Sequence, residues 1–112
     1  MKVFTVSENG VMTVRVEGEI NTITTPELAK SVEDLKGVRR LIFDMDSVRY
    51  VSSAGLRLFL ACQKTMSAAG GDMLFRNCSE LVAETFESVG YDRIMKLEIK
   101  TGKGKQDAGP EQ

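Results

Sequence analysis

The 112-residue sequence contains no histidine and only two cysteines, Cys62 and Cys78. Without histidine, the chain lacks the most common general base, the most common zinc ligand and every catalytic triad that uses a histidine. Fifteen residues separate the two cysteines, which is not a metal-ligand spacing, and no further ligand lies nearby. We therefore expect two reduced thiols in a protein core, no metal and no cofactor.

The sequence also lacks a long apolar segment and a large excess of charge of one sign. No run approaches the roughly 18 apolar residues that a membrane-spanning helix needs, and residues 1–7 lack the apolar core of a signal peptide. The 15 basic and 16 acidic residues give a net charge of −1, which does not indicate nucleic acid or an anionic membrane as the main partner. We therefore expect a cytoplasmic protein that contacts neither directly.

The pattern that is present begins with a hairpin and a helix. Residues 2–8 and 11–17 are joined by Asn-Gly, which is typical of a type I′ turn, and apolar and polar residues alternate in the second segment. Thr24 and Glu27 fit a capping box at the start of a helix, with Thr24 as the N-cap. The apolar stripe of this helix, which a glycine follows, consists of Leu28, Val32 and Leu35.

The rest of the chain predicts three more strands and two more helices. The central strand is expected at residues 38–45, where a continuous apolar run is typical of a strand covered on both sheet faces, and Asp44 and Asp46 are expected to end it. A long helix is expected from about residue 53 to 69. The remaining elements are a strand at residues 73–75, a helix with the stripe Val82, Phe86 and Val89, and a strand at residues 95–99.

The element order is therefore β-β-α-β-α-β-α-β, which predicts an α/β fold. Strands that alternate with helices indicate a mostly parallel sheet, and the N-terminal hairpin adds an antiparallel edge that makes the sheet mixed. We expect a single domain at residues 1–100. Residues 101–112 contain no hydrophobic anchor and are expected to form a flexible C-terminal tail.

The junction before the longest predicted helix carries two adjacent serines, Ser52 and Ser53, followed by Ala-Gly-Leu. A serine between a strand and a helix is most often an N-cap, which contributes about 1 kcal/mol, and at least one of the two is expected to serve as one. Gly55 costs the helix about 1 kcal/mol relative to alanine, which suggests that something needs access to the first turn.

A catalytic role for these serines is not expected. A nucleophilic serine needs a base, and the sequence has neither histidine nor a Ser-x-x-Lys or Gly-x-Ser-x-Gly motif here. A single glycine also does not make a phosphate-binding loop. We therefore expect no catalytic residue and no enzyme activity. An exposed serine at this place can instead be the substrate of a kinase, because a helix N-terminus favours the negative charge of a phosphate.

Two alternatives are open for the side chains that follow. Arg57 lies four residues after Ser53, one turn along the same helical face. It can pair with a phosphate on Ser53 or a carboxylate of a partner, or it is a solvated charge. The apolar residues of this helix either form a contact patch for a partner or are covered by core packing. They are Leu56, Leu58, Phe59, Leu60 and Cys62.

The stretch LIFDMDSVRYVSSAGLRLFL at 41–60 resembles the signature of STAS domains, specifically of anti-sigma factor antagonists. The stretch GEINTITTPEL at 18–28 resembles a second block of that family, and the resemblance covers roughly residues 2–99. In the family, the serine directly before the Ala/Ser-Gly-Leu step is phosphorylated, and this position is Ser53. Ser52 and Asn21 stand where many members carry aspartate, so that two neutral groups replace carboxylates near the phosphorylation site.

The resemblance implies a partner-switching regulator. The unphosphorylated protein would bind an anti-sigma factor that is also a serine/threonine kinase and thereby free a sigma factor. Phosphorylation of Ser53 would end this complex, and a PP2C-type phosphatase would restore it. The alternative is a STAS-like scaffold or transport-accessory subunit in which the serines are only caps. The residues implied in partner binding are Asn21, Thr22, Ser52, Ser53, Ala54, Gly55 and Arg57.

Overall fold

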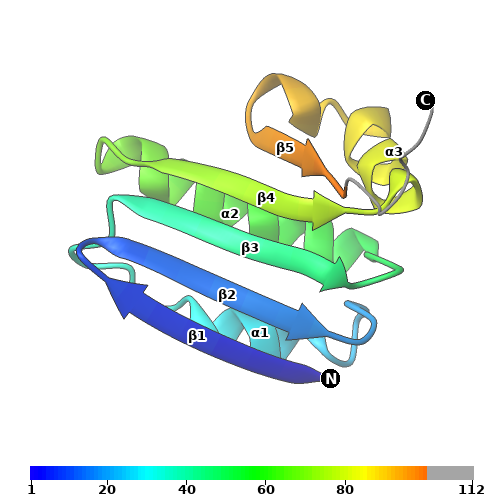
Figure 1. Ribbon diagram of the computed structural model, residues 1–112, viewed down its shortest axis with the longest axis horizontal. Coiled ribbons are helices and arrows are strands. Elements are labelled where there is room, and N and C mark those ends of the chain that lie inside the picture. The colour runs from blue at the N-terminus through cyan, green and yellow to red at the C-terminus, as the bar shows by residue number, and fades with distance from the viewer. Residues whose placement is uncertain (101–112) are drawn as a thin grey trace.

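The computed structural model describes residues 1–100 and confirms the predicted order of elements (Figure 1). The C-terminal tail predicted at residues 101–112 lies outside the described residues. The elements are β1 (Lys2–Glu8), β2 (Val11–Glu17), α1 (Thr25–Ser31), β3 (Arg40–Ser47), α2 (Ser53–Ala68), β4 (Asp72–Cys78), α3 (Glu80–Ser88), the 3-10 helix η1 (Tyr91–Arg93) and β5 (Lys96–Ile99).

The five strands form one sheet in which sequence order and spatial order are the same, β1-β2-β3-β4-β5 (Figure 1). β1 and β2 are antiparallel, and the other three pairs are parallel. The predicted type I′ turn is confirmed, because Asn9 and Gly10 both have positive φ angles, of 54° and 81°. The mixed, mostly parallel sheet with an N-terminal hairpin is therefore the observed architecture.

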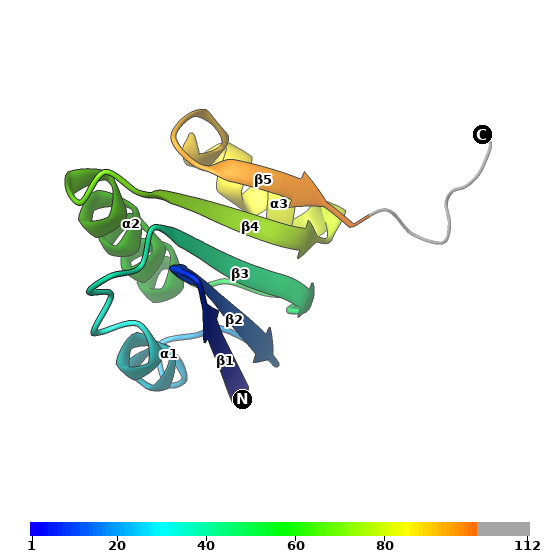
Figure 2. The same cartoon turned by 60° about the vertical axis from the view of Figure 1, so that its left-hand side comes forward.

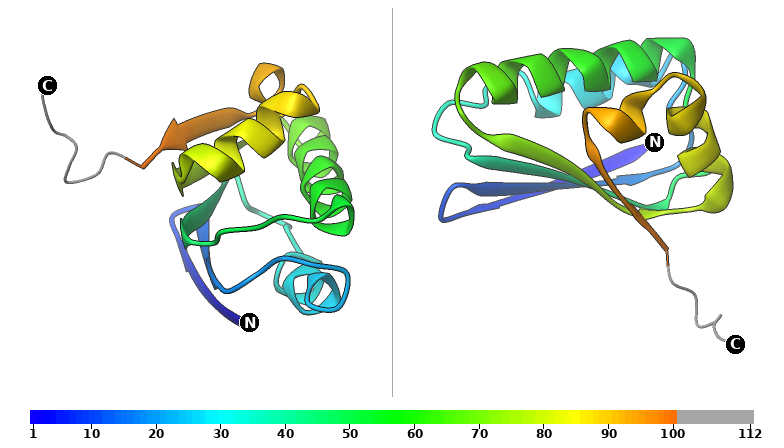
Figure 3. Two further views of the ribbon diagram at one scale, coloured as in Figure 1. Left: turned by 90° about the vertical axis from the view of Figure 1, so that its right-hand side faces the viewer. Right: turned by 90° about the horizontal axis from the view of Figure 1, so that it is seen from above.

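All three helices lie on the same face of the sheet, as Figures 2 and 3 show. The core fills the space between this face and the helices. Its centre is a cluster of phenylalanine rings from β3, β4, α2 and α3, with centroids 4.4 to 5.9 Å apart in stacked and edge-on arrangements. These rings, which are fully buried, belong to Phe43, Phe59, Phe75 and Phe86.

Among residues 1–100, no helix lies over the second face of the sheet, so the cover that the apolar run of β3 predicted on this face does not come from a helix (Figure 3). Ile42 and Leu74 lie on this open face yet are only 5% and 4% exposed. Long charged side chains at neighbouring positions explain their burial, because their methylene stems cover apolar surface while their heads pair in water. The pairs on this face are Arg15–Asp44, Arg40–Asp72 and Arg76–Glu98.

The open face also explains why the aspartates do not end β3. The strand runs from Arg40 to Ser47, so Asp44 and Asp46 lie within it rather than after it. Both point to the solvent side of the sheet, where Asp44 Oδ1 accepts a hydrogen bond of 3.2 Å from Asn77 Nδ2 and Asp46 pairs with Lys100. A carboxylate is tolerated in this strand because one of the two sheet faces is wet.

The start of α1 differs from the predicted capping box. Thr24 is the N-cap residue, but its side chain makes no capping bond. Thr24 Oγ1 instead accepts from the backbone N–H of Asn21 at 2.9 Å and donates to the carbonyl oxygen of Glu19 at 2.7 Å. Asn21 Oδ1 accepts from the backbone N–H groups of Ile23 and Thr24, both at 2.9 Å. Asn21 therefore holds the turn that leads into α1.

α1 is also shorter than predicted, because it ends at Ser31. Leu35 lies in the following loop and packs partly buried against the core from there. In α3, Val82 and Phe86 are buried as expected, whereas Val89 is 49% exposed at the end of the helix. The apolar stripes thus predicted the buried faces of the helices correctly, but they extended α1 by about one turn and α3 by one residue.

Candidate functional site

The first turn of α2 gives Ser52 and Ser53 different environments. Ser52 is the N-cap, only 8% exposed, and its Oγ accepts a hydrogen bond of 3.3 Å from the backbone N–H of Gly55. Its carbonyl oxygen accepts the first helical bond, from the N–H of Leu56 at 2.9 Å. Ser53 is the first residue of the helix, and its side chain is exposed. The capping role therefore belongs to Ser52, and the hydroxyl of Ser53 faces solvent.

Gly55 is buried, and close packing rather than access explains why no side chain stands there. A Cβ atom at this position would lie 2.6 Å from Cγ2 of Ile20 and 3.0 Å from Cγ1 of Val51. Both distances are shorter than ordinary carbon–carbon contacts. The interpretation that Gly55 keeps the first turn accessible is therefore corrected: the glycine lets α2 pack against Ile20 and Val51, in the loops that follow β2 and β3.

The two sequence blocks around residues 18–28 and 41–60 lie side by side. Ile20 and Val51 form an isolated parallel bridge, and the backbone N–H of Ser52 donates to the carbonyl oxygen of Ile20 at 2.8 Å. This bridge places the turn that contains Asn21 and Thr22 next to the start of α2. Thr22 is exposed, whereas Asn21 is half-buried because it holds the turn. The carboxyl ends of the central parallel strands thus carry one composite surface.

The sequence reasoning missed two exposed apolar side chains at this end of the molecule. Ile23, in the turn before α1, is 86% exposed, and Tyr50, in the loop before α2, is 52% exposed. The bond from the backbone N–H of Ile23 to Asn21 Oδ1 fixes the turn that presents this side chain. The available signal was an isoleucine among threonines, outside any strand or helix stripe.

Arg57 is exposed to solvent, whereas the leucines of α2 are half-buried against the core. Arg57 is exposed one turn after Ser53, and among residues 1–100 no ion pair involves it. Leu56, Leu58 and Leu60 are half-buried and pack against the core. The core-packing alternative for the apolar residues of α2 is therefore confirmed, and Ile23 and Tyr50, which are exposed near the start of this helix, lie in loops.

The family of STAS domains matches residues 3–104 of this chain. The chain belongs to the STAS domain family. It is 25% identical over 99 residues to the anti-sigma-B factor antagonist of Staphylococcus aureus, and the aligned region covers 87% of this chain and 92% of the relative. It is 30% identical over 93 residues to the BtrV protein of Bordetella bronchiseptica, and this aligned region covers 80% of this chain and 78% of the relative.

Solved structures share the fold of this STAS domain. The unphosphorylated form of the anti-sigma factor antagonist SpoIIAA superposes with a TM-score of 0.76 at 17% identity, over 86% of this chain and 87% of SpoIIAA. The phosphorylated form of the Bacillus protein SpoIIAA gives a TM-score of 0.70 at 16% identity, over 86% and 90% of the two chains. At these identities the likeness establishes the fold: one α/β domain with a five-stranded mixed sheet and three helices.

The two cysteines of this STAS domain are free and buried. Burial raises the pKa of the Cys62 thiol to about 11, and burial together with the nearby Glu98 carboxylate raises the pKa of Cys78 to about 12. Both are therefore neutral core thiols at physiological pH, as predicted. Within residues 1–100, no group of three or more histidine, cysteine, aspartate or glutamate side chains is placed to hold a metal ion. In the same residues, none of the helices is long and apolar enough to span a bilayer.

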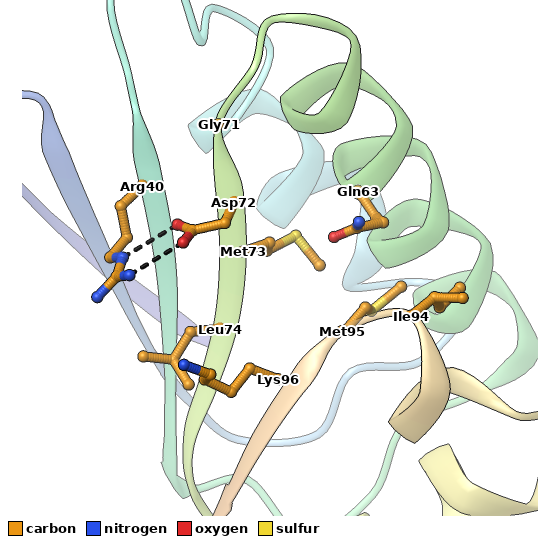
Figure 4. A pocket seen from close by; sticks show the side chains of 9 residues that line it. All are labelled: Arg40, Gln63, Gly71, Asp72, Met73, Leu74, Ile94, Met95 and Lys96. Atoms are coloured by element: carbon orange, nitrogen blue, oxygen red, sulfur yellow. Dashed lines mark hydrogen bonds and ion pairs between the residues drawn. The ribbon is translucent and has the colours of Figure 1, made fainter.

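A small cavity lies at the other end of α2, where the helix leads into β4 (Figure 4). Its volume is about 160 Å³, below the roughly 300–1,000 Å³ of small-molecule sites. Figure 4 shows Gln63 pointing from α2 towards Met73, and the Arg40–Asp72 pair, with bonds of 3.0 and 2.9 Å, lies on the strands beside it. The cavity is separated from Ser53 by most of the length of α2, so it is not part of the candidate site.

Proposed function

We propose that this STAS domain is an anti-sigma factor antagonist that is switched by phosphorylation of Ser53. The observation that carries this proposal is the position of Ser53: its hydroxyl is exposed in the first turn of α2, while Ser52 provides the cap. The relatives support the class of function, because the Staphylococcus aureus protein is an anti-sigma-B factor antagonist. SpoIIAA, which has the same fold, exists in a phosphorylated and an unphosphorylated form.

The first turn of α2 can carry a phosphate without unfolding. The first amides of a helix have no partner within the helix, and the N-terminal end of the 16-residue α2 carries partial positive charge. Of these amides, Gly55 N–H already bonds to Ser52 Oγ, so the amides of Ser53 and Ala54 can turn towards a phosphate. Arg57, one turn further on, adds a full positive charge. Phosphorylation therefore changes the charge of the surface rather than the fold.

The partner in this proposal is an anti-sigma factor that is also a serine/threonine kinase. On this STAS domain, the surface that contacts the partner comprises the exposed Ser53, the adjoining turn with Asn21 and Thr22, and Arg57. Ile23 provides the apolar anchor, because a fixed and almost fully exposed isoleucine gains most from burial in a partner pocket. Ser52, Ala54 and Gly55 act by positioning the Ser53 hydroxyl within this surface.

Phosphorylation of Ser53 ends the complex, because the phosphate adds a charge of about −1.5 to −2 in the centre of the contact surface. An unpaired charge of this size costs several kcal/mol when it is buried in an interface. A PP2C-type phosphatase then restores the binding form. Asn21 and Ser52, which stand where many family members carry aspartate, leave less negative charge near the phosphate and so lower its repulsion within the free protein.

The acceptor is tested by incubating the protein with ATP and each serine/threonine kinase encoded in the same genome, followed by intact-mass measurement. We expect one added phosphate for the wild type and none for Ser53→Ala. Ser52→Ala is the matched control: it removes the adjacent hydroxyl, and we expect it to accept one phosphate like the wild type. Phosphate on a different residue, or no transfer by any of these kinases, would contradict the phosphoswitch and favour a scaffold role for the domain.

A further inference from the structure

The N-terminal strand β1 forms one edge of the sheet, and no strand among residues 1–100 pairs with its outer side. All of its seven residues except Val3 are exposed, and they include the apolar side chains of Phe4, 49% exposed, and Val6, 65% exposed. β1 pairs with β2 over its full length in one continuous register, without a bulge, and contains no proline. Figure 1 shows α1 behind β1 and β2 rather than across the outer edge of β1. The charged side chains of this strand, Lys2 and Glu8, lie at its two ends, and its five central residues carry no charge, bulge or proline that would block edge pairing.

The opposite edge of the same sheet is built differently. β5 has only four residues, and its register with β4 is irregular between Phe75 and Cys78. Three of its four side chains are exposed, and two of these, Lys96 and Glu98, are charged, while the third is Ile99 at the end of the strand. A short, irregular and charged edge strand pairs poorly with another chain. The difference between the two edges points to β1 as the one that accepts a further strand.

The hairpin fixes which backbone groups of β1 face outward. In a two-residue hairpin the pair that flanks the turn, here Glu8 and Val11, is hydrogen-bonded, and such pairs alternate along the ladder. The even-numbered residues of β1 thus bond to β2. The N–H and C=O groups of Val3, Thr5 and Ser7 point to the free edge.

A second copy of β1 fits this edge when the strands are antiparallel and Thr5 faces Thr5. This register uses the whole strand and pairs Val3 with Ser7, so about six backbone hydrogen bonds form between the copies. Phe4 then faces Val6 of the other copy on the open side of the sheet. Lys2 faces Glu8 at both ends, so the charges at the two ends of β1 complement themselves. A parallel pairing would place like charges together.

We propose that two copies of this chain associate through their β1 strands in this register and form one continuous ten-stranded sheet. Because the strands of such a pair are related by a two-fold axis perpendicular to the sheet, the helices of both copies lie on the same side. The start of α2 follows β3, inside the sheet and away from the β1 edge, so both Ser53 hydroxyls stay accessible. The association is independent of the proposed phosphoswitch.

The first measurement is sedimentation velocity of the unphosphorylated protein from about 1 μM to about 1 mM. We expect a concentration-dependent monomer–dimer equilibrium. Thr5→Pro removes the outward N–H group at the centre of the pairing but leaves the bonds to β2, so we expect a dimer at least about tenfold weaker. A wild type that remains monomeric over this range would overturn the proposal.

The decisive measurement is a charge swap, which avoids the risk that proline disturbs the hairpin. Lys2→Glu and Glu8→Lys each place like charges opposite one another twice per dimer, and we expect each to raise the dimer dissociation constant by about five- to tenfold. The double variant restores opposite charges, and we expect it to return to within about twofold of the wild type.

Lys2 and Glu8 lie at opposite ends of one strand, so recovery in the double variant has no explanation within a single copy. Single variants that dimerise like the wild type, or a double variant weaker than either single one, would place any dimer interface elsewhere and overturn the proposal. A separate measurement, the comparison of phosphate transfer to the wild type and to Ser53→Ala, tests the proposed function. A failure of one proposal therefore leaves the other intact.

Discussion

At the scale of single residues, Ser52 and Ser53 have different tasks although they are adjacent. The side chain of Ser52 turns inward to bond Gly55 N–H, and the side chain of Ser53 remains in solvent. The sequence predicted that one of them caps α2 and that Ser53 is the phosphorylation site by resemblance. It could not assign the cap, because a shift of the helix start by one residue exchanges the two environments.

The division of tasks predicts unequal losses of stability. Ser52→Ala removes the cap and is expected to lower the free energy of unfolding by about 1 kcal/mol. Ser53→Ala removes no hydrogen bond among the described residues and is expected to change it by less than about 0.5 kcal/mol. Urea denaturation of the two variants gives both values. Equal losses would show that both serines cap the helix.

Gly55 shows what a sequence motif leaves undetermined. The sequence marks a glycine in a first helical turn as costly, but it does not show the contact that requires it, because Ile20 lies 35 positions upstream. Gly55→Ala should increase helix propensity by about 1 kcal/mol and yet destabilise the protein by about 1–3 kcal/mol, because the added Cβ would meet Ile20 at 2.6 Å.

A double-mutant cycle tests this contact. In an Ile20→Ala background, the space beside Gly55 is larger, and we expect Gly55→Ala to cost clearly less than it does in the wild type. Urea denaturation of the four proteins gives the interaction energy. Additive losses would mean that the Cβ of the new alanine meets some other neighbour.

At the scale of elements, the turn before α1 is held by an asparagine rather than by the predicted capping box. Thr24 and Glu27 have the right types and spacing for that box, but Asn21 Oδ1 accepts the backbone N–H of Thr24, which the side chain of Glu27 would accept in the box. The sequence therefore predicted the helix and its buried face. It could not decide between the capping box and the turn held by Asn21, because that choice depends on contacts outside the helix, such as the bond from Thr24 Oγ1 to the carbonyl oxygen of Glu19.

Asn21 is expected to be the key residue of this turn. Asn21→Ala loses the acceptor for the N–H groups of Ile23 and Thr24, and we expect a loss of about 1–2 kcal/mol in the free energy of unfolding. Asn21→Asp keeps both acceptor bonds and should change stability by less than about 0.5 kcal/mol. Thr22→Ala, in the same turn but exposed, is the control. An equal loss in Thr22→Ala would show that the turn is not held by Asn21.

At the scale of the whole molecule, the alternation of apolar patterns predicted the order of elements, the mixed sheet and the hairpin. It did not predict that the sheet is covered on one face only. Ile42 makes the central run look buried from both sides, and it is buried, but by charged side chains of its own and the neighbouring strands. Which residues become cross-strand neighbours depends on the register of distant segments, which a single-strand pattern does not contain.

The buried cysteines predict how stability depends on pH. In the unfolded chain both thiols ionise near their usual pKa of 9.0, but in the folded protein burial raises the pKa of Cys62 to about 11 and that of Cys78 to about 12. The unfolded state therefore binds fewer protons above about pH 9. The stabilisation is complete below this pH and is lost as the pH rises through 9 towards 11.

Urea denaturation between pH 7 and pH 10.5 checks this dependence (a range set by the thiol pKa values). We expect the free energy of unfolding to fall above about pH 9, and to fall less steeply when Cys62 and Cys78 are both replaced by alanine. This difference isolates the thiols from other groups such as Tyr91, whose pKa burial also raises. The same slope in both proteins would contradict buried, neutral thiols.

The central claim is that a phosphate on Ser53 separates this domain from its partner. The most direct measurement is calorimetric titration of the partner kinase, held without ATP, with the unphosphorylated protein and with protein phosphorylated on Ser53. We predict micromolar or tighter binding of the first form, and at least about hundredfold weaker binding of the second, because an unpaired buried phosphate costs several kcal/mol. Equal affinity of the two forms would contradict the account.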